Sequence, residues 1–137
     1  MPVKFSLSAI GQIALKVQNI DVAEKFYEST LGLRKLYRFG NLVFFDCAGV
    51  RLMVDQEEED KPSSPAASVI YFRTADIALT ARELKSRGVS FIDEPHLIAP
   101  MPDHDLWMTF FKDPSGNTLA LMHEAPKGYR PREDQTQ

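Results

Sequence analysis

The feature that most constrains the fold of this chain is an internal repeat of one order of elements: a strand, a helix and three further strands. A shift of 67 residues aligns Asp46 with Asp113 and Leu52 with Leu119. A shift of 57 residues aligns the strand-to-helix junction of the first half with that of the second half. The repeat predicts an α+β fold made of two βαβββ modules.

The first module is predicted to span about residues 8–55. Ile10–Val17 alternates apolar and polar residues, as a half-buried strand does. Asp21 is the predicted N-cap of a helix that stops at Gly32. The three short strands expected after it are Leu33–Phe39, Leu42–Cys47 and Val50–Asp55.

The second module is predicted to span about residues 68–124, after an acidic linker at 56–67 and before a polar tail at 125–137. Asp76 caps its helix and Gly88 ends it. The expected strands are Val69–Thr74, Val89–Ile92, Trp107–Lys112 and Thr118–His123. The stretch 93–106 carries three prolines and receives no prediction.

Composition narrows the class of protein. With 137 residues, 44% apolar and 26% charged, the chain fits one ordinary globular domain. A net charge of -3 gives no basic footprint for nucleic acid, and no run of about 18 apolar residues exists to cross a membrane. Cys47 is the only cysteine, which excludes an intrachain disulfide. We therefore expect a cytoplasmic protein that binds neither nucleic acid nor membrane.

Two segments carry a resemblance to a known family. Phe110–Met122 reads FFKDPSGNTLALM, in which Gly116 is free to take a positive φ in a tight turn. It resembles the closing hairpin of the vicinal-oxygen-chelate superfamily, which includes glyoxalases, bleomycin-resistance proteins and extradiol dioxygenases. The opening strand from Gln12 and the pair Phe26–Tyr27 also resemble that family. The resemblance covers about residues 8–124 and implies an open, barrel-like mixed sheet around a cleft, in a homodimer.

The resemblance also implies four metal-ligand positions, on the first and last strand of each module. In this sequence they fall on Gln12, Met53, Val69 and Ala120. The amide oxygen of Gln12 suits a divalent ion, but valine and alanine offer no donor and a thioether is a poor ligand for hard or borderline ions. We therefore expect neither a metal nor another cofactor at this site.

An alternative keeps a divalent metal (Ni, Mn, Fe or Zn) on displaced ligands, namely Gln12, His96 and His104. His104 lies between Asp103 and Asp105, and an imidazole titrates in the range that a general acid or base needs, so His104 is also the one candidate catalytic residue. An exposed loop histidine beside solvated carboxylates explains the same pattern. No nucleophile with an adjacent base is identified.

Strand alternation places the neighbours of the four family positions on the cleft face as well. The predicted ligand-binding residues are Gln12, Arg51, Met53, Val69, Tyr71, Arg73, Trp107, Ala120 and Met122. Guanidinium groups suit carboxylate or phosphate, so the expected ligand is a partly apolar organic anion. Pairing of the arginines with nearby acids is the alternative, and for Trp107 the alternative to ligand stacking is a core or interface role.

Three functions remain open at this stage. The first is a metal-free protein that binds a small molecule, and it is the one we expect. The second is a metal-dependent lyase, isomerase or dioxygenase of glyoxalase type with displaced ligands. The third is a structural or regulatory dimer with a vestigial cleft. In each case the expected partners are a small-molecule ligand or a second copy of the chain.

Overall fold

A computed structural model describes residues 7–58 and 68–131 of the chain. The first module comprises β1 (Gln12–Val17), α1 (Ile20–Lys25), a π-helical turn η1 (Phe26–Thr30), β2 (Arg34–Phe39), β3 (Leu42–Cys47) and β4 (Val50–Gln56). The second comprises β5 (Ile70–Arg73), α2 (Ile77–Ser86), β6 (His96–Pro100), β7 (Asp105–Lys112) and β8 (Thr118–Ala125). The two predicted βαβββ modules are confirmed.

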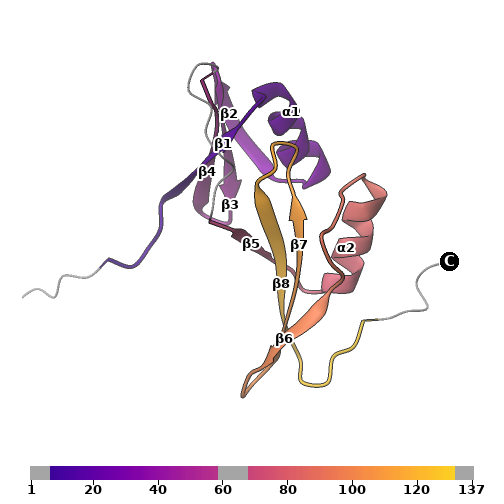
Figure 1. Cartoon of the computed structure of the whole chain (residues 1–137). Helices are drawn as coiled ribbons and strands as arrows, with labels where there is room; N and C mark the ends of the chain where they lie inside the picture. The colour runs from indigo at the N-terminus through magenta and orange to yellow at the C-terminus, as the bar shows by residue number, and fades with distance from the viewer. Residues whose placement is uncertain (1–6, 59–67, 132–137) are drawn as a thin grey trace, which may run out of the picture.

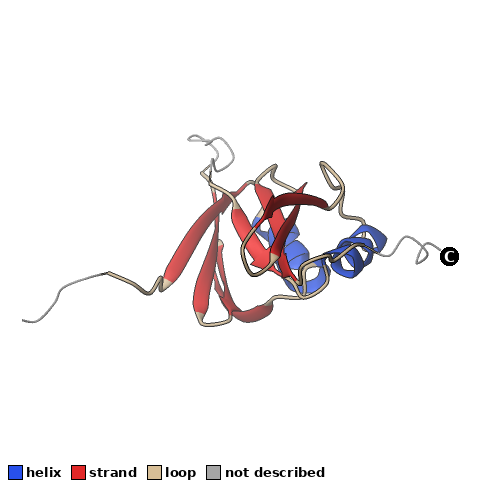
Figure 2. Cartoon of the chain, turned by 90° about the horizontal axis from the view of Figure 1, so that it is seen from below, coloured by secondary structure: helices blue, strands red, loops and turns tan. Residues whose placement is uncertain are grey.

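Each module forms its own four-stranded mixed sheet. Sheet A has the order β1-β4-β3-β2 and sheet B the order β5-β8-β7-β6, so the two orders correspond strand by strand. In both sheets the first strand runs parallel to the last and the other neighbours are antiparallel. The sheets are open and are not closed into a barrel (Figures 1 and 2). Within the described residues, no helix has the length and apolar character needed to cross a membrane.

The helices begin at equivalent side-chain caps. The Asn19 side chain accepts the Val22 N–H at 3.0 Å, and the Asp76 side chain accepts the Leu79 N–H at 3.1 Å. The prediction that Asp21 caps the first helix is wrong, because Asp21 already lies in the helix and Asn19 has the extended backbone of a cap. The Asp76 cap is as predicted.

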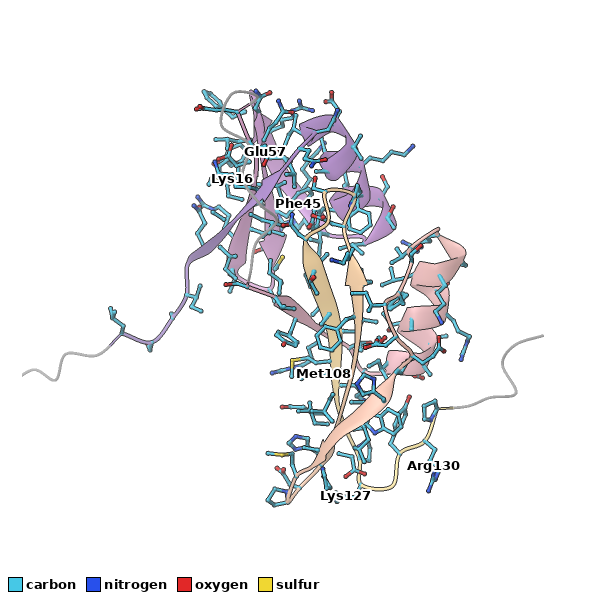
Figure 3. The ribbon with its side chains drawn as sticks, viewed as in Figure 1. Lys16, Phe45, Glu57, Met108, Lys127 and Arg130 are labelled. Atoms are coloured by element: carbon cyan, nitrogen blue, oxygen red, sulfur yellow. The ribbon has the colours of Figure 1, made fainter. Side chains whose placement is uncertain are left out.

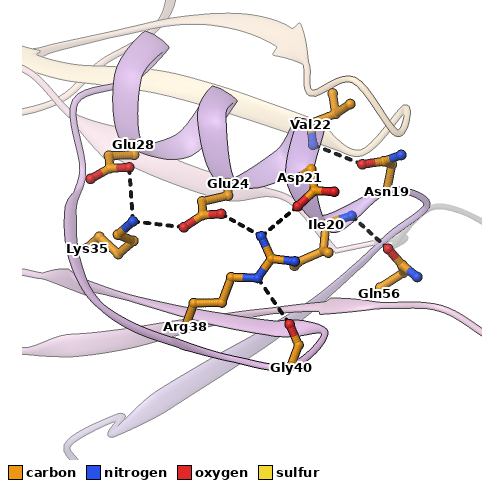
Figure 4. Close-up of polar contacts among 10 residues, drawn as sticks. All are labelled: Asn19, Ile20, Asp21, Val22, Glu24, Glu28, Lys35, Arg38, Gly40 and Gln56. Carbon is orange, nitrogen blue, oxygen red and sulfur yellow. Dashed lines mark hydrogen bonds and ion pairs between the residues drawn. The ribbon is translucent and has the colours of Figure 1, made fainter.

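Charged side chains bind α1 to strand β2 along the helix-covered side of sheet A (Figure 4). Arg38 contacts Asp21 at 2.6 Å and Glu24 at 2.7 Å, and Lys35 contacts Glu24 at 2.8 Å. The hydrogen bond from Lys35 is the main reason that the pKa of Glu24 is lowered. This network fixes the helix over the outer strand of the sheet.

One core runs through both modules, between the sheets and the two helices. Both helices lie on the same side of the sheets, which leaves the other face of each sheet without a covering layer (Figure 1). The largest fully buried side chains are Tyr27, Phe45, Phe111, Ile77 and Leu119. Because these residues come from both modules, the two halves form one hydrophobic core.

The turn between β7 and β8 joins the two modules through hydrogen bonds. Tyr27 donates its hydroxyl to the Asp113 carboxylate at 2.7 Å, in a buried contact. Asn117 donates its amide to the Lys16 carbonyl at 2.8 Å, and Ser115 accepts the Gln18 N–H at 2.9 Å. The Asp-Pro-Ser-Gly-Asn segment that carried the family resemblance is therefore the joint between the halves.

The strand register moves one of the residue matches predicted between the two modules by one position. Cys47 pairs with Val50 across the first hairpin turn, whereas the Asp113 N–H bonds to the Asn117 carbonyl across the second. Asp113 therefore takes the place of Cys47, and the predicted alignment of Asp46 with Asp113 is off by one residue. The reason is that the second turn is one residue longer, so the shift is 67 on the last strand and 66 on the strand before it.

The predicted strand Val89–Ile92 is wrong. Only Phe91 there pairs with another strand residue, in an isolated bridge to Phe111. The outer strand is β6, which lies in the proline-rich stretch that received no prediction, and it ends on Pro100. An edge strand tolerates proline because one side of its backbone needs no ladder partner.

The predicted linker and tail are described only in part. Strand β4 continues through Gln56, and residues 59–67 of the linker lie outside the described residues. Strand β8 continues to Ala125, one residue beyond the predicted end of the second module. Residues 126–131 of the predicted tail are described, and residues 132–137 are not.

Candidate functional site

The uncovered face of each sheet, here called the open face, carries most of the predicted ligand-binding residues. On sheet A the strand register sets them in rows across the strands. One row is polar and reads Gln12, Arg51, Asp46, Arg34 from β1 to β2. The next row is largely apolar and reads Ala14, Met53, Phe44, Tyr37. The open face of sheet A therefore places a polar strip beside an apolar one.

Arg51 lies where these two rows meet. Its guanidinium carbon is 5.9 Å from the centre of the Phe44 ring, and Phe44 in turn stacks on Tyr37 with ring centres 4.7 Å apart. The Arg51 side chain has no ion pair or hydrogen bond with any residue that the structure describes. A cation on an aromatic face with free N–H donors is a suitable anchor for an anion that also has an apolar part.

Two further cations differ from each other: Arg73, and Lys16, which strand alternation also places on the cleft face. Lys16 pairs with Asp55 on the neighbouring strand, and this hydrogen bond raises the pKa of Lys16. Arg73, at the end of β5, has no side-chain partner among the described residues. The alternative, in which these cations pair with nearby acids, holds for Lys16, whereas Arg51 and Arg73 have no acidic partner among the residues that the structure describes.

The open face of sheet B is more apolar. Tyr71, Ala120 and Phe110 lie side by side on β5, β8 and β7, and the rings of Tyr71 and Phe110 meet edge to face at 6.1 Å. Ala120 between them is fully buried. Met122 lies in the next row, opposite Met108. Arg73 and His96 end this row on β5 and β6, so the face offers an aromatic and thioether surface with polar groups at its two edges.

Trp107 lies on the other face of sheet B. It pairs with His123 across the strands and packs edge to face on Tyr129, with ring centres 5.5 Å apart. Its indole N–H is buried and has no partner in the part of the chain that the structure describes. The structure therefore does not bring Trp107 together with Ala120 and Met122.

The remaining predicted residues form two groups, one on each sheet. Gln12 lies beside Arg51 and donates to the Met53 sulfur at 3.8 Å, whereas Tyr71 and its neighbours belong to the other module. Lys16 on sheet A and Met108 on sheet B lie well apart along the molecule (Figure 3).

The four positions of the family metal site do not suit a divalent ion. Gln12 is exposed at the start of β1, and its amide N–H points to Met53. Val69 precedes β5, and Ala120 is buried under aromatic rings. An amide, a thioether and two hydrocarbon side chains are a poor donor set for metals that prefer oxygen or nitrogen ligands.

The alternative ligands also lie in separate places. His96 is on the outer strand β6, facing Met108, whereas Gln12 is on the first strand of sheet A. His104 lies in the turn before β7, with Nδ1 at 2.7 Å from Asp103 and Nε2 at 3.9 Å from Glu124. Among the described residues, no group of three or more His, Cys, Asp or Glu side chains is arranged to hold a metal.

Two cavities lie away from the predicted cleft residues, except for Arg73. One, of about 440 Å³, is lined by Arg73, Thr74, Ala75, His123 and Glu124. The other, of about 250 Å³, is mainly apolar and lies between the two modules. Sequence reasoning placed His123 on the helix side of its strand, where the structure has it, but no pattern indicated that β5 ends early enough to leave a cavity beside it.

The comparisons with known proteins agree with this architecture. An integron cassette protein from the mobile metagenome of V. cholerae superposes with a TM-score of 0.72 at 18% identity, covering 90% of this chain and 100% of that one. A lactoylglutathione lyase from Agrobacterium tumefaciens gives 0.68 at 22% identity, with 90% and 98% covered. A member of the glyoxalase/bleomycin resistance protein/dioxygenase superfamily from Sphaerobacter thermophilus gives 0.68 at 25% identity, with 86% and 98% covered.

The sequence comparison points to the same family. No curated protein matches the chain. The family model described as Glyoxalase/Bleomycin resistance protein/Dioxygenase superfamily matches residues 9–121, which is most of the chain. The match includes β1, the inter-module turn and the first half of β8. The chain belongs to the glyoxalase/bleomycin resistance protein/dioxygenase superfamily.

Proposed function

We propose that this chain is a metal-free binding protein for a small, partly apolar organic anion, and that it acts as a homodimer in the cytoplasm. The observation that carries the proposal is Arg51, whose guanidinium lies over Phe44 on an open sheet face and has no ion pair with a described residue. Gln12 adds an amide beside it, and Met53 and Tyr37 add apolar surface. Such a surface selects a carboxylate or phosphate attached to an apolar group.

The dimer is proposed because these faces are poorly covered in one chain. Phe39 is 73% exposed, Tyr37 49% and Tyr71 45%. Aromatic side chains exposed to this extent on the open faces of both sheets favour a protein or ligand contact over permanent contact with water. A second copy laid over them encloses the Arg51 surface and removes the bound anion from solvent. The one cysteine, Cys47, is a free thiol, which fits a reducing compartment.

Binding of a panel of carboxylates tests the ligand class. Isothermal titration of benzoate, phenylacetate and hexanoate, each with its neutral amide, measures the dependence on the charge. Arg51→Gln is expected to weaken binding of the best acid about tenfold. Arg34→Gln is the matched control, since Arg34 shares the face but lies 3.8 Å from Asp46. Equal effects of the two substitutions, or equal affinity for acids and amides, reject the Arg51 anchor.

Sedimentation velocity tests the dimer. The wild type is expected to sediment as a dimer, and Phe39→Lys with Tyr71→Lys is expected to shift it to monomer, because both side chains are exposed and lie on the open faces. Leu79→Lys is a control at an exposed residue of α2, on the helix side. A wild-type monomer at all concentrations contradicts the proposed assembly, whatever the result of the titrations.

A further inference from the structure

The end of strand β5 is the place where the second module departs from the first. In the first module, β1 continues to Val17, and the Glu57 N–H donates to the Val17 carbonyl at 2.8 Å. In the second module, β5 ends at Arg73, and the last bond along this edge runs from the Thr74 N–H to the Met122 carbonyl at 2.8 Å. Beyond that bond, no described residue continues the backbone hydrogen bonds along this edge of β8.

The backbone of Glu124 faces this uncovered edge. Because Met122 directs its carbonyl toward β5, Glu124, two residues further along the strand, directs its N–H and carbonyl the same way. No described residue forms a backbone hydrogen bond with the Glu124 N–H on that side. An uncovered strand-edge N–H of this kind is an unused donor.

The cavity of about 440 Å³ lies at this point and is lined by Glu124 and Arg73. The Arg73 guanidinium has no side-chain partner among the described residues. His123 also lines the cavity, with its Nδ1 accepting the Ile77 N–H at 3.4 Å, so its neutral ring carries the proton on Nε2. Residues with three potential donor groups therefore line one cavity.

A second cavity lies beside the first. Arg73 and Thr74 line both, so the two cavities are neighbours. The second cavity, of about 250 Å³, is lined by Leu31 and Leu33 of the first module and Phe72, Leu84, Phe111 and Leu121 of the second. A cavity lined by a cationic side chain therefore adjoins an apolar one.

We propose that these cavities form a second binding site, distinct from the Arg51 surface, for a small carboxylic acid with a short apolar chain or ring. The carboxylate accepts hydrogen bonds from Arg73 and from the Glu124 N–H, and the apolar part fills the cavity between the modules. Glu124 also lines this cavity, and its negative charge disfavours a doubly charged anion, so a monocarboxylate binds in preference to phosphate.

Nuclear magnetic resonance titration of the full chain with hexanoate tests this site. Hexanoate is expected to shift the Glu124 amide and the methyl groups of Leu33 and Leu84. Arg73→Gln is expected to lower the hexanoate affinity measured from these shifts about tenfold. Arg51→Gln is expected to leave that affinity unchanged. Hexanamide and inorganic phosphate are expected to bind about tenfold more weakly than hexanoate. The spectrum of each free variant shows that it is folded.

Leu33→Trp tests the apolar part separately, because Leu33 lies in the partly buried loop at the edge of the cavity. Filling the cavity is expected to reduce the affinity for hexanoate to that for acetate, which has almost no chain. An unshifted Glu124 amide, an Arg73→Gln variant that binds like the wild type, or a stronger response to phosphate overturns the proposal. Since Arg51→Gln separates the two sites, failure here leaves the function proposed above untouched.

Discussion

The two modules share one plan for the start of the helix but differ in the side chain that completes it. In the first module, Gln56 accepts the Ile20 N–H at 2.9 Å. In the second, His123 accepts the Ile77 N–H at 3.4 Å from the equivalent position. The first N–H of the helix is thus accepted by an amide in one module and by an imidazole in the other. The repeat preserves this hydrogen bond but not the residue that accepts it.

The hairpin turns differ more. The first has Ala48 and Gly49 between Cys47 and Val50, with Ala48 at φ 53° and Gly49 at φ 97°. The second is longer by one residue and contains Asp113, which accepts hydrogen bonds from the Ser115 and Asn117 N–H groups at 2.9 and 2.8 Å. The longer turn is the one that binds the other module.

Removal of Asp113 is expected to have the largest effect. Asp113→Ala leaves the buried Tyr27 hydroxyl and two backbone N–H groups without their acceptor and is expected to cost about 3 kcal/mol of unfolding free energy. Cys47→Ala, at the equivalent place in the first turn, is expected to cost about 1 kcal/mol, since it removes only a half-buried sulfur. Urea denaturation measures both. Similar losses contradict the view that only the second turn joins the modules.

Tyr27→Phe removes one of the hydrogen bonds that join the two modules, the one from the Tyr27 hydroxyl to Asp113. The ring stays in the core and Asp113 loses a single donor, so the expected cost is about 1.5 kcal/mol. Burial, together with the Asp113 charge, raises the pKa of Tyr27, so the wild type loses stability above about pH 10, where the unfolded tyrosine ionises, and the variant lacks this loss. Tyr37→Phe, at an exposed position, is the control and is expected to change stability by less than about 0.5 kcal/mol. Equal effects of the two substitutions contradict the assigned role of the Tyr27 hydroxyl.

These contrasts also mark what the sequence could predict. The repeat and the turn from Asp113 to Asn117 identified two modules, because tight turns and helix caps depend on local chemistry. The sequence could not predict which face of the sheet Trp107 lies on. The middle of β7 reads Leu-Trp-Met-Thr-Phe-Phe and is largely apolar on both sides, so alternation assigns no face. The early end of β5 depends on the path of Thr74 into α2, a tertiary property without a sequence signal.

His123→Gln is expected to have the smallest effect at neutral pH, and it tests the equivalence of the modules directly. Burial lowers the pKa of His123 below 6.5, partly opposed by the charge of Asp76, so below pH 6.5 the unfolded chain takes up a proton that the folded chain resists. The wild type therefore loses stability as the pH falls. The variant, which carries the residue of the first module, lacks this loss.

Urea denaturation of His123→Gln and wild type at about pH 8 and about pH 5.5 measures the difference. The two proteins are expected to be similar at the higher pH, because a glutamine oxygen accepts the Ile77 N–H as Gln56 accepts that of Ile20. At the lower pH the variant is expected to be the more stable. Gln56→His is the reverse control and is expected to acquire acid sensitivity. If His123→Gln is strongly destabilised at the higher pH, the two positions share only their place in the repeat, and the imidazole has a packing role against Tyr129 that an amide cannot fill.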